Sequence, residues 1–285
     1  MTDESKPIAT LFLVATPIGN LEDISLRALR VLKEVDLIAC EDTRHTAKLL
    51  HYYGIATPRE SHHEHNEAAH TRRLLALLQE GKSVALVSDA GTPLFSDPGY
   101  PLVAACREAG FPVVPVPGPC AAVSALTASG LPGDCCLFAG FLPAQRGRRR
   151  KKLQELSSIQ ATLVLYEAPH RLLAAMEDMI DILGNRRACL ARELTKIHEE
   201  WLRGTLAEIL EALGTRPLIR GEITLVLDRG DEETGRPQPS CPASIKEHLE
   251  QEMRKSGASR NDALKVVARE RGISRKDAYR QLFRK

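Results

Sequence analysis

The chain has 285 residues, of which 43% are hydrophobic and 27% are charged, a composition that excludes a disordered chain and allows two domains of ordinary size. No apolar run approaches the ~18 residues of a membrane helix, and the polar, acidic start does not resemble an export signal. We therefore expect a cytoplasmic protein. Seven scattered cysteines without a Cys-x-x-Cys pair fit buried thiols in a reducing compartment.

The net charge of +2 hides an uneven distribution of charge. Residues 241–285 contain 12 Lys and Arg against 6 Asp and Glu, whereas the preceding residues contain 27 against 31. A second basic block, residues 146–152, carries six positive side chains. Neither block has an amphipathic aromatic face, which favours nucleic acid over a membrane as the partner. A solvated surface or a linker is the alternative interpretation.

The first 130 residues alternate short apolar runs with helical patterns. Strands are expected at residues 8–15, 36–40, 84–87 and 113–116, and helices at 25–34, 68–79, 100–108 and 120–129. Because parallel strands are joined by right-handed helical crossovers, this order predicts a largely parallel sheet in a first domain, residues 1–132.

The pattern changes in a second domain, residues 133–228. Strands are expected at 136–140, 162–166, 188–192, 196–202 and 222–227, and helices at 149–156, 170–183 and 205–213. Two of these strands are too close in sequence for a helical crossover, so the second sheet should contain antiparallel pairs. After a charged linker at 229–243, the region 244–285 should form three short helices at 245–254, 261–271 and 275–282, with Ser259 and Ser274 as candidate N-caps.

A polar loop at residues 88–99 follows the apolar run 84–87. Ligands of open α/β sheets bind at the carboxyl ends of strands, and an ordinary connection needs only about two to six residues, so this longer loop is a candidate ligand site. The loop at residues 15–20 lacks the GxGxxG fingerprint and offers only a tight turn or a close approach at Gly19.

Carboxylates and histidines at other strand ends are candidates for acid–base chemistry. Glu41 and Asp42 precede Arg44, a pattern typical either of a helix cap with a local ion pair or of the edge of a polar site. His65 and Glu67 belong to a segment with three histidines, but its spacing does not suit a metal, so no metal site is expected and the mouth of the crevice is favoured. Hydrolase and kinase motifs are missing.

Nine segments, in order, resemble the bacterial family of 16S rRNA (cytidine-2′-O)-methyltransferases, RsmI: ATPIGNLEDIS, ACEDTRHT, SHHEHNE, VALVSDAGTPLFSDPG, PGPCAA, FAGFLP, LYEAPHRL, ARELTKIHEE and GEITLVL. They cover nearly all of residues 8–228. The resemblance implies an α/β, two-domain tetrapyrrole-methylase-like fold with a mostly parallel N-terminal sheet and a mixed C-terminal sheet, to which this chain adds a small helical extension. It also implies S-adenosylmethionine in the cleft between the domains, and a homodimer.

The implied reaction is methylation of the ribose 2′-hydroxyl of a cytidine in the decoding region of 16S rRNA, within the assembled small ribosomal subunit. The class commonly has a GxGPGD-like first loop, and the departure at residues 16–20 argues for RNA and against a porphyrinoid substrate. A small-molecule methyltransferase of the same fold and a non-catalytic ribosome-assembly protein are the alternatives.

The resemblance also implies site residues. Those matching the cofactor site are Pro17, Ser88, Asp89, Ala90, Gly91, Thr92, Ser96, Cys120, Ala121 and Glu167. Candidates for proton transfer or charge stabilisation are Glu41, Asp42, His65, Glu67 and Lys196. A neutral histidine or a desolvated lysine is a better base than a carboxylate with a pKa of about 4. Candidates for binding RNA are Arg44, Arg146, Arg148, Arg149, Arg150, Lys151, Arg171 and Arg192. For Arg44, Arg171 and Arg192 the alternative is that they bind the carboxylate of the cofactor.

Overall fold

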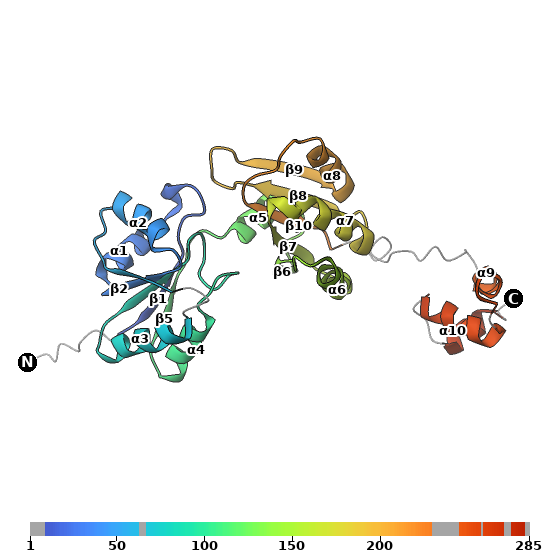
Figure 1. Ribbon diagram of the computed structural model, residues 1–285, viewed down its shortest axis with the longest axis horizontal. Coiled ribbons are helices and arrows are strands. Elements are labelled where there is room, and N and C mark those ends of the chain that lie inside the picture. Colours follow the sequence, from blue (N-terminus) through green and yellow to red (C-terminus); the bar gives the residue numbers. More distant parts are fainter. Residues whose placement is uncertain (1–8, 63–66, 230–244, 258, 271–274, 283–285) are drawn as a thin grey trace, which may run out of the picture.

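Short runs of Val, Leu, Ile and Ala form two five-stranded sheets in the computed structural model, which describes residues 9–62, 67–229, 245–257, 259–270 and 275–282 (Figure 1). The strands of the first sheet lie in the order β3-β2-β4-β1-β5, and every pair is parallel, as predicted. Their bounds are β1 Leu11–Val14, β2 Leu37–Cys40, β3 Arg59–Ser61, β4 Val84–Val87 and β5 Val113–Val116.

Helices cover both faces of this sheet. The first apolar layer packs α1 (Leu26–Glu34) and α2 (Thr43–Tyr52) on one face, and a second layer packs α3 (Glu67–Gln79) and α4 (Tyr100–Glu108) on the other (Figure 1). A short helix, η1 (Leu21–Asp23), follows the first loop. Since β4 lies between two strands and two helical layers, all four of its residues are buried.

The second sheet is mixed and has the order β6-β7-β10-β8-β9. Only β6 and β7 are parallel, which confirms the predicted antiparallel pairs. Its elements are β6 Cys136–Phe141, α6 Arg146–Ser157, β7 Thr162–Glu167, η2 Pro169–Arg171, α7 Leu172–Leu183, β8 Arg187–Arg192, β9 Glu200–Thr205, α8 Leu206–Gly214 and β10 Ile223–Leu227.

One helix bridges the two sheets. The helix α5 (Ala121–Ser129) falls in the range expected for the first domain, yet it packs on the second sheet (Figure 1). Its buried Ala122 and Ala125 share an apolar cluster with Cys189 and Val226. Small side chains let this helix approach the strands closely, so the start of α5 is fixed between the two domains.

The last three helices are α9 Ile245–Ser256, α10 Arg260–Glu270 and α11 Arg275–Leu282, and they share a small apolar cluster of their own. The hydroxyl of Ser259 accepts a hydrogen bond from the amide of Asp262, which confirms this residue as an N-cap. Ser274 lies outside the described residues.

Two expectations from composition concern the surface. None of the helices in the described ranges is long and apolar enough to cross a bilayer. The prediction of buried thiols is wrong for Cys135 and Cys136, which are exposed.

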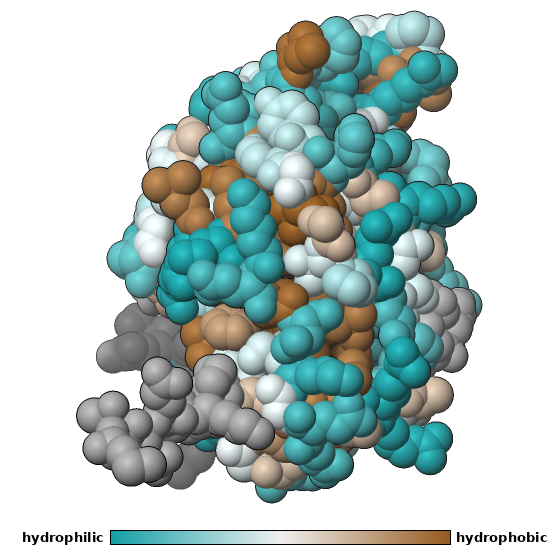
Figure 2. Space-filling view, turned by 90° about the vertical axis from the view of Figure 1, so that its left-hand side faces the viewer, coloured by the Kyte–Doolittle hydropathy of each residue, from teal (hydrophilic) through white to brown (hydrophobic). Residues whose placement is uncertain are grey.

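On the face in Figure 2, hydrophilic residues surround a broken band of hydrophobic ones. Such interspersed apolar residues are normal on folded proteins.

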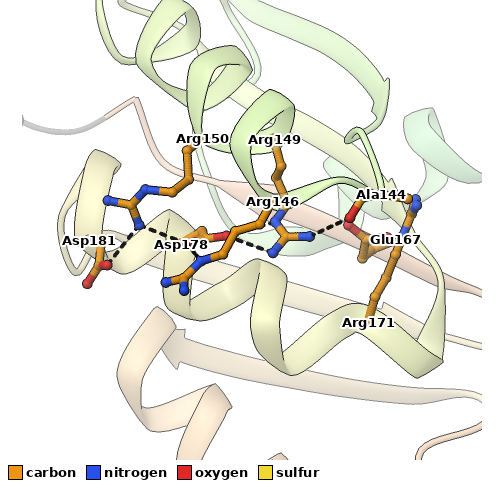
Figure 3. A network of polar contacts seen from close by, with 8 residues as sticks. All are labelled: Ala144, Arg146, Arg149, Arg150, Glu167, Arg171, Asp178 and Asp181. Carbon is orange, nitrogen blue, oxygen red and sulfur yellow. Dashed lines mark hydrogen bonds and ion pairs between the residues drawn. The ribbon is translucent and has the colours of Figure 1, made fainter.

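The basic block forms the first turns of α6 instead of preceding the helix (Figure 3). Arg146, Arg149 and Arg150 converge on Asp178 of α7, with nitrogen–oxygen distances of 3.2, 2.7 and 2.8 Å. The Asp178 side chain is fully buried. Cations are unfavourable at a helix N-terminus, so this carboxylate both compensates their charge and joins α6 to α7.

This arrangement corrects the RNA-binding expectation for Arg149. Its side chain is only 5% exposed and is held by Asp178, so it is not available to a phosphate. Arg148 and Lys151 are exposed and make no ion pair with any residue that the structure describes. They keep the surface position that contact with RNA requires.

Replacing Asp178 by alanine should lower the free energy of unfolding by about 3 kcal/mol or more, because the buried Arg149 loses its counter-charge. Chemical denaturation of the variant measures this loss. The control is Asp181→Ala, which removes a 56% exposed partner of Arg150 and should change stability far less. Equal effects of the two substitutions would contradict the structural role of Asp178.

Candidate cofactor and substrate site

A cavity of about 380 Å³ lies where the carboxyl ends of the first sheet face the second sheet. Its walls are the loop after β4, the start of α5, the end of β7 and the start of β10. The size falls in the usual range for small-molecule sites, about 300–1,000 Å³. The switch from one domain to the other therefore leaves a ligand-sized space at the strand ends.

Most of the residues matched to the cofactor site line this cavity: Asp89, Ala90, Gly91, Thr92, Ser96, Cys120, Ala121 and Glu167. Pro17 and Ser88 line a neighbouring cavity instead. Phe95 and Asp97, in the predicted loop 88–99, also line it. The sequence did not single out the other wall residues: Ile18, Phe141, Tyr166, Ala168, Pro169, Gly221, Glu222, Ile223 and Thr224. Many of them lie in the nine segments that resemble the family, so the resemblance was the signal that could have identified them.

Internal hydrogen bonds fix the loop after β4. Thr16 and Gly91 exchange two backbone hydrogen bonds of 2.9 and 3.0 Å across the two loops. The hydroxyl of Ser88 donates to the carbonyl of Gly91, and that of Thr92 donates to the carbonyl of Pro119. These two hydroxyls therefore shape the cavity wall.

The carboxylate of Glu167 is buried at the wall of the cavity. Its Oε1 accepts hydrogen bonds from the amide of Ala168 and from Arg171, so the Arg171 guanidinium already has a partner. Its Oε2 is buried and has no hydrogen-bond partner among the described residues. An unpaired buried acceptor costs roughly 1–3 kcal/mol or more, so the site suits a ligand that carries a donor.

A second acidic group, Asp97, is half-buried in the same wall. Burial, together with the negative charges of Glu41 and Asp89, raises the pKa of Asp97 to about 6, and a hydrogen bond with Ser88 acts to lower it. A carboxyl with this pKa changes charge near neutral pH. A positively charged ligand would favour its ionised form.

The neighbouring cavity, of about 570 Å³, lies between the first loop, the exposed face of α2 and Lys196. It shares Ile18, Asp89, Ala90 and Glu222 with the first cavity. The two cavities therefore lie side by side at the end of β4.

Close backbone contact holds the two domains together beside this junction. The amide of Asn20 donates a 3.0 Å hydrogen bond to Thr195 Oγ1. A Cβ atom on Gly19 would lie only 2.5 Å from Lys196 Cγ, which confirms the expected close approach at this glycine. Gly221 has φ +94° and lies equally close to Glu193.

The backbone is strained on both sides of the cleft. Among the described residues, the non-glycine residues with positive φ are Leu94, Ser96, Glu193 and Thr195, at 69°, 70°, 52° and 65°. Such conformations cost free energy and cluster at functional sites. The turn at residues 193–196 also explains why the predicted strand 196–202 begins only at Glu200.

Lys196 projects to the junction from this turn. Its Nζ lies 2.9 Å from Glu193 Oε1 and 3.2 Å from Glu222 Oε2. Partial burial lowers the pKa of Lys196, but these two carboxylates outweigh it and raise the pKa above the usual value. These two carboxylates therefore favour the cationic form of Lys196 over the neutral form that a base requires.

Asp42 is likewise unsuited to be a base. Its carboxylate caps α2 by accepting a 2.8 Å hydrogen bond from the amide of Arg44, and it also binds the Arg44 guanidinium. These hydrogen bonds hold the pKa of Asp42 well below its usual value. The alternative of a helix cap with a local ion pair is thus confirmed.

The other residues that the sequence suggests for proton transfer or RNA binding lie in different parts of the chain. Glu41 is half-buried next to Asp42, and Arg192 pairs with Glu200 at 2.8 Å. His65 lies outside the described residues, and Glu67 is the first residue of α3. Within the described ranges, His, Cys, Asp and Glu do not form a group of three that could hold a metal ion.

Comparisons with known proteins agree with this architecture. The family model of the Tetrapyrrole (Corrin/Porphyrin) Methylases matches residues 10–210. Among solved structures, uroporphyrin-III-C-methyltransferase from Thermus thermophilus has a TM-score of 0.56 at 28% identity, covering 78% of this chain and 94% of that one. Diphthine synthase has a TM-score of 0.61 at 16% identity, covering 77% and 90%.

Two curated relatives are both called ribosomal RNA small subunit methyltransferase I. That of Halalkalibacterium halodurans is 48% identical over 272 residues, 95% of this chain and 93% of its own length. That of Pseudomonas aeruginosa is 56% identical over 201 residues, 70% and 71% of the two chains. The chain therefore belongs to the tetrapyrrole methylase family, in the branch of the ribosomal RNA small subunit methyltransferases I, and is an S-adenosylmethionine-dependent methyltransferase.

Proposed function

We propose that this enzyme methylates the ribose 2′-oxygen of a cytidine in the decoding region of 16S rRNA, within the assembled small ribosomal subunit. The observation that supports it best is the junction of the two cavities, which share Asp89, Ala90 and Glu222. A cofactor in the first cavity and a nucleoside in the second would meet there. The names of the curated relatives supply ribosomal RNA as the substrate class.

The first cavity suits the cofactor. S-adenosylmethionine supplies an electrophilic methyl group on a positively charged sulfur, and it carries amino and hydroxyl donors. The buried, unpaired Oε2 of Glu167 can accept one of these donors, and Asp97 adds negative charge to the same wall. The aromatic wall of Phe95, Phe141 and Tyr166 offers an apolar surface for a flat ring.

In the reaction, the ribose oxygen gains the methyl group, the methyl–sulfur bond breaks, and the hydroxyl proton passes to a base. The proposed proton acceptors are Glu41, His65 and Glu67, of which a neutral histidine is the best base. Asp89 Oδ1 accepts a 3.0 Å hydrogen bond from the amide of Asp42, so this side chain is fixed at the junction. The Lys196 ammonium stabilises negative charge that develops on the oxygen.

Affinity for RNA would come mainly from cations outside the cleft. The exposed Arg148 and Lys151 and the basic region 244–285 are the proposed contributors. A homodimeric state and a cytoplasmic location, implied by the family resemblance, belong to the same proposal.

The test is methyl transfer from labelled cofactor to free 16S rRNA and to assembled small subunits that lack the modification. We expect label on the ribose of one decoding-region cytidine, and only in the assembled particle. Nuclease digestion followed by mass spectrometry locates the methyl group. Label on a base, or on a small molecule in place of RNA, would contradict the proposal.

Glu167→Gln should weaken S-adenosylmethionine binding about tenfold or more, because a hydrogen bond to a charged acceptor contributes roughly 1.5–3 kcal/mol. Isothermal titration calorimetry measures the dissociation constant, and thermal unfolding checks the fold. The matched control is Glu177→Gln, at an exposed position on α7. An unchanged affinity in Glu167→Gln would remove this carboxylate from the cofactor site.

Cofactor affinity should depend on pH through Asp97. Its pKa is raised to about 6, so the carboxyl is ionised at pH 8 and becomes neutral as the pH falls below 6. Loss of this negative charge weakens the attraction for the cationic cofactor, by at most about tenfold per pH unit for one proton. The affinity for S-adenosylmethionine, measured from pH 8 to pH 5, should decline in the wild type. In Asp97→Asn it should stay constant over the same pH range.

Lys196→Ala should lower the single-turnover rate of methylation about a hundredfold or more, the cost typical of removing a group that stabilises developing negative charge. Cofactor affinity should change little, because Lys196 lines the second cavity and not the first. Lys196→Arg keeps the positive charge and should retain part of the rate. A wild-type rate in Lys196→Ala would exclude a role in the chemistry.

A further inference from the structure

The second cavity continues outward into a third hollow, of about 750 Å³, between the first loop and the turn after β8. The two share Gly19, Leu21, Tyr52 and Lys196. The three hollows therefore lie next to one another, from the cofactor cavity to the exposed face of α2, and are together called the groove. A groove of this kind has room for more than one nucleoside.

The exposed face of α2 presents His45, Lys48, His51 and Tyr52 to this groove. Their spacing places them on neighbouring turns, while Leu49 and Leu50 face the core. The side chains of His45, Lys48 and His51 make no hydrogen bond or ion pair with any described residue, in contrast to those of Arg30 or Lys82, which pair with neighbouring glutamates. One acidic residue, Glu22, lines the outer hollow.

Tyr52 has the geometry of a stacking platform. Its side chain is 64% exposed, and its ring contacts Tyr53 edge-on, with the centroids 4.9 Å apart and the planes at 82°. Tyr53 is itself fixed by a 2.6 Å hydrogen bond from its hydroxyl to the carbonyl of Leu21. The Tyr52 ring is therefore supported at one edge while much of it stays accessible to a flat ligand.

We propose that this face of α2 binds the rRNA strand beside the methylated nucleotide, with Tyr52 stacking on an unpaired base and Lys48 contacting a phosphate. The inference rests on the proposed function, because it takes the substrate to be RNA. Exposed aromatic rings among unpaired cations are the combination that binds single-stranded nucleic acid. The positive charge on this face is a local feature of the surface, because residues 1–240 as a whole contain more acidic than basic side chains.

The test compares full-length variants in binding unmethylated small ribosomal subunits and in methylating them. Tyr52→Ala should weaken binding about fivefold or more, the cost of losing one base–aromatic stack of roughly 1 kcal/mol or above. Tyr52→Phe keeps the ring and should bind like the wild type. Lys48→Ala should reduce the slope of log affinity against log salt concentration by about one.

Matched controls come from elsewhere on the same domain. Tyr100→Ala removes a 74% exposed tyrosine from α4, on the other face of the sheet (Figure 1). Lys33→Ala removes an exposed lysine from α1. Both controls should bind subunits like the wild type, and every variant should retain its affinity for S-adenosylmethionine.

The inference is overturned if Tyr52→Ala binds like Tyr100→Ala, or if Tyr52→Phe is as weak as Tyr52→Ala. It is also overturned if Tyr52→Ala changes the oligomeric state in sedimentation, since the face would then join two copies of the chain. Failure of the proposed function is a separate result: the wild type would methylate another atom, while the differences in binding would still decide whether α2 contacts RNA.

Discussion

The close approach of two backbones, at Gly19 in the first domain and at residues 193–196 in the second, determines the shape of the cleft. A side chain on Gly19 would overlap Lys196 Cγ and Thr195 Oγ1, and one on Gly221 would overlap Glu193. The turn between these glycines holds strained residues, and its carboxylate, Glu193, binds both Lys196 and the amide of Glu222. The ammonium is therefore positioned by packing at the junction of the two cavities, where the reaction would take place.

The architecture follows from patterns that a sequence displays directly. Buried strands such as Val84–Val87 are short apolar runs between helical patterns, and the spacing of β8 and β9 requires an antiparallel pair. The strand Arg59–Ser61 carries no such signal, because its three residues are polar and it lies at the sheet edge. Likewise, the sequence suggests that α5 belongs to the first domain, and only its tertiary contacts place it on the second sheet.

The site was less accessible to sequence reasoning, because the role of a charged residue depends on its partner. The sequence alone suggests a free cation at Arg149 and a desolvated base at Lys196. The first neutralises a buried aspartate 29 residues away, and the second is raised in pKa by Glu193 and by Glu222. Asp97 shows the converse case, in which burial and neighbouring carboxylates raise the pKa of a residue that reads as an ordinary loop aspartate. Pairing across the sequence, which no local pattern records, decides each of these roles.

The groove separates charge along its length. Glu167, Asp97 and Asp89 line the inner cavity, whereas unpaired His45, Lys48 and His51 line the outer face, and the ion pair of Lys196 with Glu222 lies at the border. A cationic cofactor and a polyanionic substrate need opposite surroundings, and a single cleft can hold both only if the two signs are kept apart. An acidic body is thus compatible with an RNA substrate, because Lys48 at the mouth of the cleft and the cations outside it face the strand, while the carboxylates line the inner cavity. The same separation favours a substrate oxygen that enters from the cationic side and meets the methyl group at the border.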